Sequence, residues 1–427
     1  MNTDLFIELN RRANPEWSRQ FSNRQFEDGL LRLKAVANLI KEHFEINSDS
    51  FYQTSKLRIS IVGTNGKGST AFALEKLFRQ GFSNIASNRK YITGLFTSPH
   101  LIDVTERIRI NGISVSRSEL QTCYQSIIEI IQKSSKNNSH RYIEYFESFT
   151  YFELLTLLAF YLFQLEKLPV EIYEAGLGGR LDATRIANAN VVAVTSIGMD
   201  HTKLLGHTRK QIFHEKIGIL QPNCKLLLLK DSKLKRWLPA LPNVEVFTYD
   251  SIKQSYLEAS QQFAQLIYES CRSRFQFLSQ LPDLSSIHIE APAGRIEKRK
   301  TENRLFIFDN AHNASALFKL LVDLRNESIQ ITTIVLAMPK DRRPAPIFRL
   351  LNRFELHRIL LVEGEGLQQF STSLQSVSSG IVSLDTAHSL ESKFNENDKV
   401  VLFVGSHKLY DLFDKVSQAA SLVERSV

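Results

Sequence analysis

The stretch L-R-I-S-I-V-G-T-N-G-K-G-S-T, residues 57–70, decides the fold of this chain. Its first six residues, Leu57–Val62, are rich in apolar and β-branched side chains, which predicts a buried strand. Three glycines then open a loop around Lys67. Residues 71–80 combine strong helix formers with apolar side chains at helical spacing. A strand, a glycine loop and a helix in this order are the context in which a P-loop holds phosphate.

The residue types in this loop fit that chemistry. Glycine lets backbone N–H groups approach an anion without a Cβ in the way. The N-terminus of the following helix adds unpaired N–H donors and partial positive charge. Lys67 supplies a point charge for the β- and γ-phosphates, and the hydroxyl of Ser69 or Thr70 is suited to hold Mg²⁺. One departure from the general P-loop pattern is Gly68, which separates Lys67 from Ser69. We predict that the phosphates of a nucleotide bind to Gly63, Thr64, Asn65, Gly66, Lys67, Gly68, Ser69 and Thr70.

The composition is that of an ordinary globular protein, with 43% hydrophobic and 23% charged residues. At 427 residues the chain is long enough for two or three domains. Apolar runs stay below the roughly 18 residues needed to cross a bilayer, and the first residues do not have the layout of a signal peptide. We therefore expect a cytoplasmic protein with no membrane partner.

Cysteines and charge point to no further chemistry. Cys123, Cys224 and Cys271 are widely spaced and form no C-x-x-C pair, so we interpret them as buried or incidental thiols. The formal net charge of +8 favours anionic partners without choosing among them. The densest basic cluster is R-I-E-K-R-K, residues 295–300. Because the chain has neither zinc-finger spacing nor an RNP-like aromatic strand, we predict no nucleic-acid partner.

Strand and helix signals alternate along the rest of the chain. Helices are expected at residues 4–51, 113–138, 146–163, 213–220 and 255–271. Strands are expected at residues 94–97, 170–174, 191–197, 225–229, 244–249, 305–308, 331–338, 358–363, 380–385 and 399–405. The alternation predicts an α/β fold with parallel sheets. Pro292 and Gly294 predict a break in regular secondary structure before the last α/β part of the chain. We predict a P-loop mononucleotide-binding domain at residues 1–290 and a smaller Rossmann-like domain at residues 291–427.

One carboxylate is placed for metal binding. Glu174 ends the predicted strand at residues 170–174, and open α/β sheets bind ligands at the carboxyl ends of their strands. Mg²⁺ is a hard cation that prefers oxygen ligands. Ser98 is followed by Pro99, which pushes it out of helical geometry and predicts an ordered loop.

Several motifs occur in an order that resembles the folylpolyglutamate synthase/dihydrofolate synthase branch of the Mur ligase superfamily. They are G-T-N-G-K-G-S-T, T-S-P-H-L followed by E-R-I-R-I-N-G, F-T-Y-F-E, E-A-G-L-G-G-R-L-D-A-T, D-H with L-G-H-T and E-K-I-G-I, and D-N-A-H-N. The resemblance covers roughly residues 29–220 and 291–409. It implies an ATP-dependent ligase that adds L-glutamate to a folate or dihydropteroate carboxylate through an acyl phosphate.

The resemblance also implies site residues. Two Mg²⁺ sites are implied, with Ser98, Glu174 and His201 as ligands. Lys216 is the position of a lysine that is carbamylated in the superfamily, a change that turns an ammonium into a carboxylate-like metal ligand. The pterin substrate is implied to contact Phe152, Leu181, Asp182 and Ala183. Arg295 and Asp309 are implied to contact ATP, and His312, Lys67 and Lys216 to take part in catalysis.

Residues 222–290 depart from the family pattern. The family segment L-x-G-x-H-Q-x-x-N-A, whose Asn lies near adenine, is absent, and Y-L-E-A-S-Q-Q-F-A-Q-L at residues 256–266 stands in its place. This departure keeps open a nucleotide-binding protein without ligase activity. A Mur-type ligase for a cell-wall precursor is a further alternative, although T-S-P-H-L and L-D-A-T argue against it. We expect a monomer.

Overall fold

A computed structural model of the chain describes residues 4–13, 22–45, 56–85, 90, 92–134, 139–250, 254–340, 344–354, 358–370, 380–383, 390 and 393–423. The chain divides into two compact units. The first contains Met1–Ser98 and Val104–Glu290, and the second contains Pro99–Asp103 and Ala291–Val427. The short segment Pro99–Asp103 therefore groups with the C-terminal part of the chain.

The first unit is built on a sheet in which the described strands have the order β4-β3-β2-β5-β1-β6-β7-β8. Strand β1 (Leu57–Val62) lies between β5 (Val170–Glu174) and β6 (Val191–Val194), and both pair with it in parallel. The other strands are β2 (Thr93–Phe96), β3 (Ile108–Ile110), β4 (Ile113–Ser114), β7 (Leu226–Leu229) and β8 (Glu245–Thr248). Only the pairs of β3 with β2 and β4 are antiparallel among these strands. The carboxyl ends of β5, β1, β6 and β7 consequently meet at one edge of the sheet.

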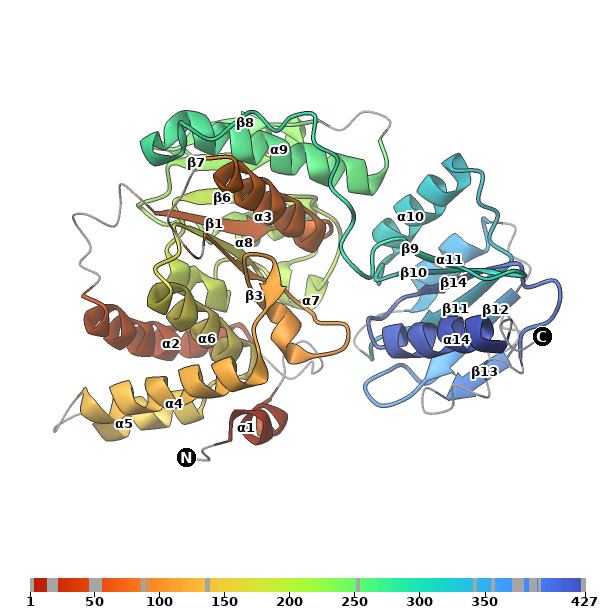
Figure 1. Ribbon diagram of the computed structural model, residues 1–427, viewed down its shortest axis with the longest axis horizontal. Coiled ribbons are helices and arrows are strands. Elements are labelled where there is room, and N and C mark those ends of the chain that lie inside the picture. Colours follow the sequence, from red (N-terminus) through yellow and green to blue (C-terminus); the bar gives the residue numbers. More distant parts are fainter. Residues whose placement is uncertain are drawn as a thin grey trace. The chain divides into compact units, whose positions relative to one another are not determined.

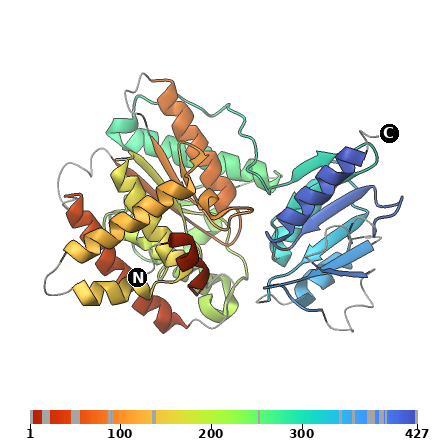
Figure 2. The same cartoon turned by 60° about the horizontal axis from the view of Figure 1, so that its bottom comes forward.

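Helices cover both faces of this sheet (Figure 1). Helices α3 (Lys67–Ser83) and α9 (Tyr256–Arg274) lie side by side on one face, where they bury Leu57, Ile59 and Ile61 of β1. The opposite face packs against α6 (Tyr151–Leu165) and α8 (Arg209–Ile217). Around α6 gather α2 (Asn23–His43), α4 (Arg117–Lys133) and α5 (Ser139–Glu147) (Figure 2). The shorter helices are α1 (Leu5–Arg11), α7 (Thr202–Leu205), η1 (Val104–Arg107), η2 (Ala183–Ala187), η3 (Ser232–Trp237) and η4 (Gln276–Leu278).

Two of the expected helices have other bounds in the structure. The helix expected at residues 113–138 starts only at Arg117, since Asn111 and Gly112, both at positive φ, turn the chain into a β3–β4 hairpin. The helix expected at residues 146–163 is split between α5 and α6. Thr150 caps α6 by accepting from the Glu153 N–H, while the Glu153 carboxylate accepts from the Thr150 N–H. This capping box starts a new helix where the apolar pattern alone continues.

The helix expected at residues 4–51 is also not continuous. It consists of α1 and α2, and residues 14–21 and 46–51 lie outside the described residues. No single described helix is both long and apolar enough to cross a membrane. One pair does pass by length and composition, His140–Glu147 with Tyr151–Leu165, but the two helices are bent by 117°.

The second unit has its own sheet, with the described strands in the order β13-β12-β11-β14-β10-β9. Its strands are β9 (Glu297–Lys300), β10 (Leu305–Asp309), β11 (Thr333–Ala337), β12 (Arg358–Glu363), β13 (Gly380–Ser383) and β14 (Val400–Val404). Its described helices are α10 (Ala314–Asn326), α11 (Pro344–Leu351) and α14 (Leu409–Val423). All neighbours pair in parallel except β9, which runs antiparallel to β10. The predicted α/β fold with a second Rossmann-like part is confirmed. Residues 384–385 of the expected strand at 380–385 lie outside the described residues.

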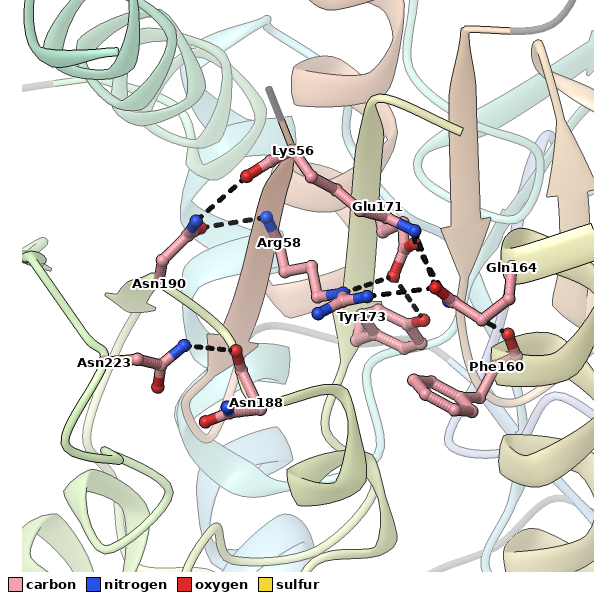
Figure 3. Close-up of polar contacts among 9 residues, drawn as sticks. All are labelled: Lys56, Arg58, Phe160, Gln164, Glu171, Tyr173, Asn188, Asn190 and Asn223. Carbon is pink, nitrogen blue, oxygen red and sulfur yellow. Dashed lines mark hydrogen bonds and ion pairs between the residues drawn. The ribbon is translucent and has the colours of Figure 1, made fainter. Parts of the chain in front are cut away.

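A buried polar network fixes the amino ends of β1 and β5 (Figure 3). The fully buried Glu171 carboxylate accepts hydrogen bonds from Arg58 Nε (3.0 Å), Tyr173 Oη (2.9 Å) and Gln164 Nε2 (3.0 Å), and it pairs with Lys56. Burial alone raises the pKa of Glu171, but Lys56 and Arg58 outweigh that effect and lower it. Burial lowers the pKa of Lys56 to about 8, against the opposing charge of Glu171. The network therefore lies at the amino ends of the strands, opposite to the glycine loop, which follows the carboxyl end of β1.

Candidate nucleotide and metal site

The glycine loop lies between β1 and α3, and its backbone requires glycine at two positions. Gly63 has φ +152°, and a Cβ placed on it would lie 1.8 Å from Thr195 Oγ1. Gly66 caps α3 in the left-handed region at φ +84°, and no side-chain hydrogen bond caps the helix there. The loop is held against the end of β6, because Thr64 N donates to Ser196 O at 2.6 Å. The first turn of α3 therefore keeps backbone donors for an anion.

Two hydroxyls in the first turn of α3 are buried without a hydrogen-bond partner. They are Ser69 Oγ and Thr70 Oγ1, and these residues are 4% and 0% exposed. Buried hydroxyls in folded proteins almost always have a partner, so an exception calls for an explanation such as a bound ion. The sequence predicts that one of these two hydroxyls holds Mg²⁺ in the phosphate loop.

Two lysine ammonium groups converge on one carbonyl oxygen of this loop. Lys67 Nζ lies 3.3 Å from Gly63 O, and Lys216 Nζ, from α8, donates to the same oxygen at 2.8 Å. The pKa of Lys216 is lowered to about 7, chiefly by burial and to a lesser extent by the charge of Lys67, while Asp182 opposes the shift. Lys216 is thus a core residue and not a surface cation. The concentration of positive charge at the mouth of α3 favours an anionic ligand.

The loop after β5 packs on the backbone of α8. A Cβ on Gly179 would lie 2.1 Å from Lys216 O, so only glycine allows this approach. The buried Asp182 carboxylate accepts from Leu177 N (2.9 Å), from Thr184 N (2.9 Å) and from Thr184 Oγ1 (2.6 Å). Burial raises the pKa of Asp182, against these hydrogen bonds. In this structure Asp182 holds its own loop together and caps η2.

The remaining predicted substrate residues lie next to this loop. Leu181 is half-buried, and Ala183 is the first residue of η2. Phe152 is 8% exposed, with its ring centroid 5.6 Å from that of Phe96. A Cβ on Gly176 would lie 2.8 Å from the Phe152 ring. Phe152 is therefore packed as a core aromatic beside the loop, and its contact with substrate stays a prediction, as do those of Leu181, Asp182 and Ala183.

The structure brings two of the three predicted metal ligands together. Ser98 N donates to Glu174 Oε2 at 3.1 Å, so the T-S-P-H loop is tied to the end of β5. His201 caps α7 at φ +45°, and its Nε2 lies 4.0 Å from Asp200 Oδ1. Among the residues that the structure describes, no group of three or more His, Cys, Asp or Glu side chains is arranged to hold a metal ion. Metal binding by Ser98, Glu174 and His201 stays a prediction.

The last three predicted residues belong to the second unit. The Asp309 carboxylate at the end of β10 accepts from Ile296 N (3.0 Å) and from Ala311 N (2.8 Å), and so fixes the loops on both sides of it. His312 Nδ1 lies 3.0 Å from Asn310 O. Arg295 is half-buried, and its Nη1 donates to the adjacent Gly294 O at 3.3 Å. The roles of Arg295, Asp309 and His312 toward ATP stay predictions.

One polar pair beside the loop is not among the predicted residues. Lys230 Nζ donates to Ser260 Oγ at 3.1 Å, and Ser260 Oγ would lie 3.4 Å from a Cβ on Gly66. The sequence gives only a weak indication of this pair: Lys230 is the first charged residue after the run L-L-L-L of β7.

The site thus consists of a glycine loop at the carboxyl edge of an open, mostly parallel sheet, in a chain that has a second α/β unit. No protein-family model matches the chain. It is 42% identical over 183 residues to the dihydrofolate synthase/folylpolyglutamate synthase of Buchnera aphidicola subsp. Baizongia pistaciae, covering 43% of this chain and 38% of that protein. It is 31% identical over 265 residues to the Haemophilus influenzae protein of the same name, covering 61% of this chain and 51% of that protein.

Structural similarity extends along nearly the whole chain. The bifunctional folylpolyglutamate synthase/dihydrofolate synthase of Yersinia pestis, solved in complex with AMPPNP and a Mn ion, superposes with a TM-score of 0.69 at 23% identity, covering 98% of this chain and 97% of that one. The chain is therefore related in sequence, over part of its length, to the dihydrofolate synthase/folylpolyglutamate synthases, and it has their fold. The resemblance found in the sequence motifs is confirmed.

Proposed function

We propose that the protein is an ATP-dependent ligase that adds L-glutamate to the carboxylate of a folate or of dihydropteroate. ATP phosphorylates the substrate carboxylate, and the acyl phosphate is then attacked by the amino group of glutamate with release of phosphate. The sequence relatives named above are dihydrofolate synthase/folylpolyglutamate synthases, which supports this proposal. We further propose that it acts in the cytoplasm as a monomer.

The observation that carries the proposal is the charge arrangement at Gly63. The Nζ atoms of Lys67 and Lys216 both lie at the carbonyl oxygen of this residue, in the loop that leads into α3. While Lys216 is protonated, the two like charges repel each other and a polyanion removes the repulsion; once Lys216 is carbamylated, Lys67 keeps a positive charge for the phosphates. The triphosphate of ATP supplies the negative charge, with its oxygens on the backbone donors of the first turn of α3.

The donor set beside the loop fits a divalent cation. Ser69 and Thr70 offer hydroxyls that have no hydrogen-bond partner, and the Glu174 carboxylate lies at the end of the neighbouring strand β5. All of these are oxygen ligands, which Mg²⁺ prefers. Bound there, the ion neutralises charge on the transferring phosphoryl group. Glu174 and Ser98 would hold one ion, and His201 with a carbamylated Lys216 a second one.

The surroundings of Lys216 support carbamylation. Its amine is buried, and its pKa is lowered to about 7, chiefly by burial. The lowered pKa increases the share of Lys216 that is neutral near pH 7, and only the neutral amine attacks CO₂. The product carries a negative charge, which the adjacent Lys67 ammonium stabilises.

A lysine substitution tests the proposal. Lys67→Ala removes the ammonium beside the loop and should abolish ATP-dependent glutamate ligation while the protein still unfolds at the wild-type temperature. Lys76→Ala, nine residues further along α3, is the matched control and should leave activity unchanged. Turnover by Lys67→Ala at near the wild-type rate would contradict the proposed use of the loop.

A further inference from the structure

Lys230 occupies the edge of the first sheet at which the glycine loop lies. It follows β7 directly, and its backbone N–H donates to Val194 O at the end of β6 (2.9 Å). Strand β6 in turn pairs with β1, which leads into the loop. Because the carboxyl ends of parallel strands form the ligand-binding edge of such a sheet, Lys230 is placed on the ligand side.

One serine holds this lysine beside the loop. Ser260, in the first turns of α9, is 1% exposed, accepts from Lys230 Nζ at 3.1 Å and donates to Tyr256 O at 2.8 Å. Its hydroxyl would lie only 3.4 Å from a Cβ on Gly66. A single buried hydroxyl therefore separates the Lys230 ammonium from the residue that caps the phosphate-binding helix.

We propose that Lys230, positioned by Ser260, contacts the nucleoside part of the bound nucleotide and donates a hydrogen bond to N7 of its purine ring. The contact deepens, and rests on, the ATP site proposed above. An ammonium has three donors and no acceptor, so it recognises only acceptor atoms. N7 lies on the purine edge that faces the 5′-phosphates in the anti conformer, so we assign it to a donor beside the phosphate loop.

The strand β7 offers a matched control for this contact. Lys225 immediately precedes β7 and is exposed at the opposite edge of the sheet. Lys230→Met and Lys225→Met remove the same charge from the two ends of one strand. A hydrogen bond from a charged donor predicts roughly a tenfold or larger loss of ATP affinity in Lys230→Met, and no change in Lys225→Met.

Calorimetric titration with three probes tests the assignment: ATP, 7-deaza-ATP, which lacks N7, and inorganic tripolyphosphate, which lacks the nucleoside. We expect wild-type protein to bind 7-deaza-ATP about as weakly as Lys230→Met binds ATP. Tripolyphosphate should bind equally to both proteins. Ser260→Ala, which keeps the charge and loses its anchor, should weaken ATP binding and leave tripolyphosphate binding unchanged.

The outcomes separate this contact from the proposed function. Equal affinity of wild-type protein for ATP and 7-deaza-ATP overturns the N7 contact, and this result needs no variant to fold. Weaker tripolyphosphate binding by Lys230→Met also overturns it, because the ammonium then acts on phosphate. A wild-type protein that binds tripolyphosphate and ATP equally well contradicts the nucleoside contact alone. Failure of wild-type protein to bind ATP at all contradicts the proposed function, and with it this contact.

Discussion

Replacing Glu171 by glutamine should destabilise the first unit strongly. The Glu171 carboxylate is 0% exposed, and the side chains of Lys56 and Arg58, which pair with it, are only 7% and 16% exposed. Glu171→Gln keeps the volume but leaves two largely buried cations without a counter-charge. Removing one partner of a buried ion pair typically costs about 3–5 kcal/mol. At about 2–4 °C per kcal/mol for units of this size, the melting temperature should fall by on the order of 10 °C.

The assay is urea and thermal unfolding, compared with an exposed pair. Glu129 pairs with Lys133 on the surface of α4, where their side chains are 63% and 77% exposed. Glu129→Gln should cost no more than about 0.5 kcal/mol, since exposed pairs on a helix contribute little. Adding Lys56→Met to Glu171→Gln removes one of the two cations that lack a counter-charge and should restore part of the stability. Equal losses for Glu171→Gln and Glu129→Gln would refute the reasoning from burial.

Three further predictions concern the site. Activation by bicarbonate should be stronger at pH 8 than at pH 6, because the pKa of Lys216 is lowered by burial to about 7 and the amine becomes neutral as the pH rises. Ligation rates after preincubation with bicarbonate measure this effect. A pH-independent response, together with no rescue of Lys216→Ala by short carboxylic acids, would argue against carbamylation. Glu174→Gln should raise the Mg²⁺ concentration needed for half-maximal ligation by roughly tenfold, and an unchanged Mg²⁺ titration would remove Glu174 from the metal site. Gly63→Ala should abolish ATP binding in a calorimetric titration, because its Cβ would lie 1.8 Å from Thr195 Oγ1; wild-type affinity would show that the loop adapts to the added methyl group.

Local patterns in the sequence were sufficient for the central elements. β1, the glycine loop and α3 follow one another directly in the sequence, so residue types and spacing predicted them. The break between α5 and α6 was missed because the aromatic run hides the Thr150 cap. Strand β9 was missed because its residues, E-K-R-K, are all charged; its pairing with β10 makes it a strand. Tertiary contacts of this kind override local propensity.

The sequence names candidate site residues but not the contacts that these residues make. That Lys216 reaches Gly63, 153 positions away, and that Gly179 lies on the Lys216 backbone, depends on how α8 packs. The same holds for Asp182, whose carboxylate is fully engaged within its own loop. A sequence motif identifies such a carboxylate, but only packing tells whether it faces a ligand or its own backbone.

The most direct measurement of the central claim follows ADP release and the incorporation of labelled L-glutamate together. Wild-type protein is supplied with ATP, Mg²⁺ and either dihydropteroate or a tetrahydrofolate. A ligase that works through an acyl phosphate should form one ADP for each glutamate incorporated, and only when both the pterin substrate and glutamate are present. Tight ATP binding without glutamate-dependent ADP release from any of these substrates would contradict the account and favour a nucleotide-binding protein without ligase activity.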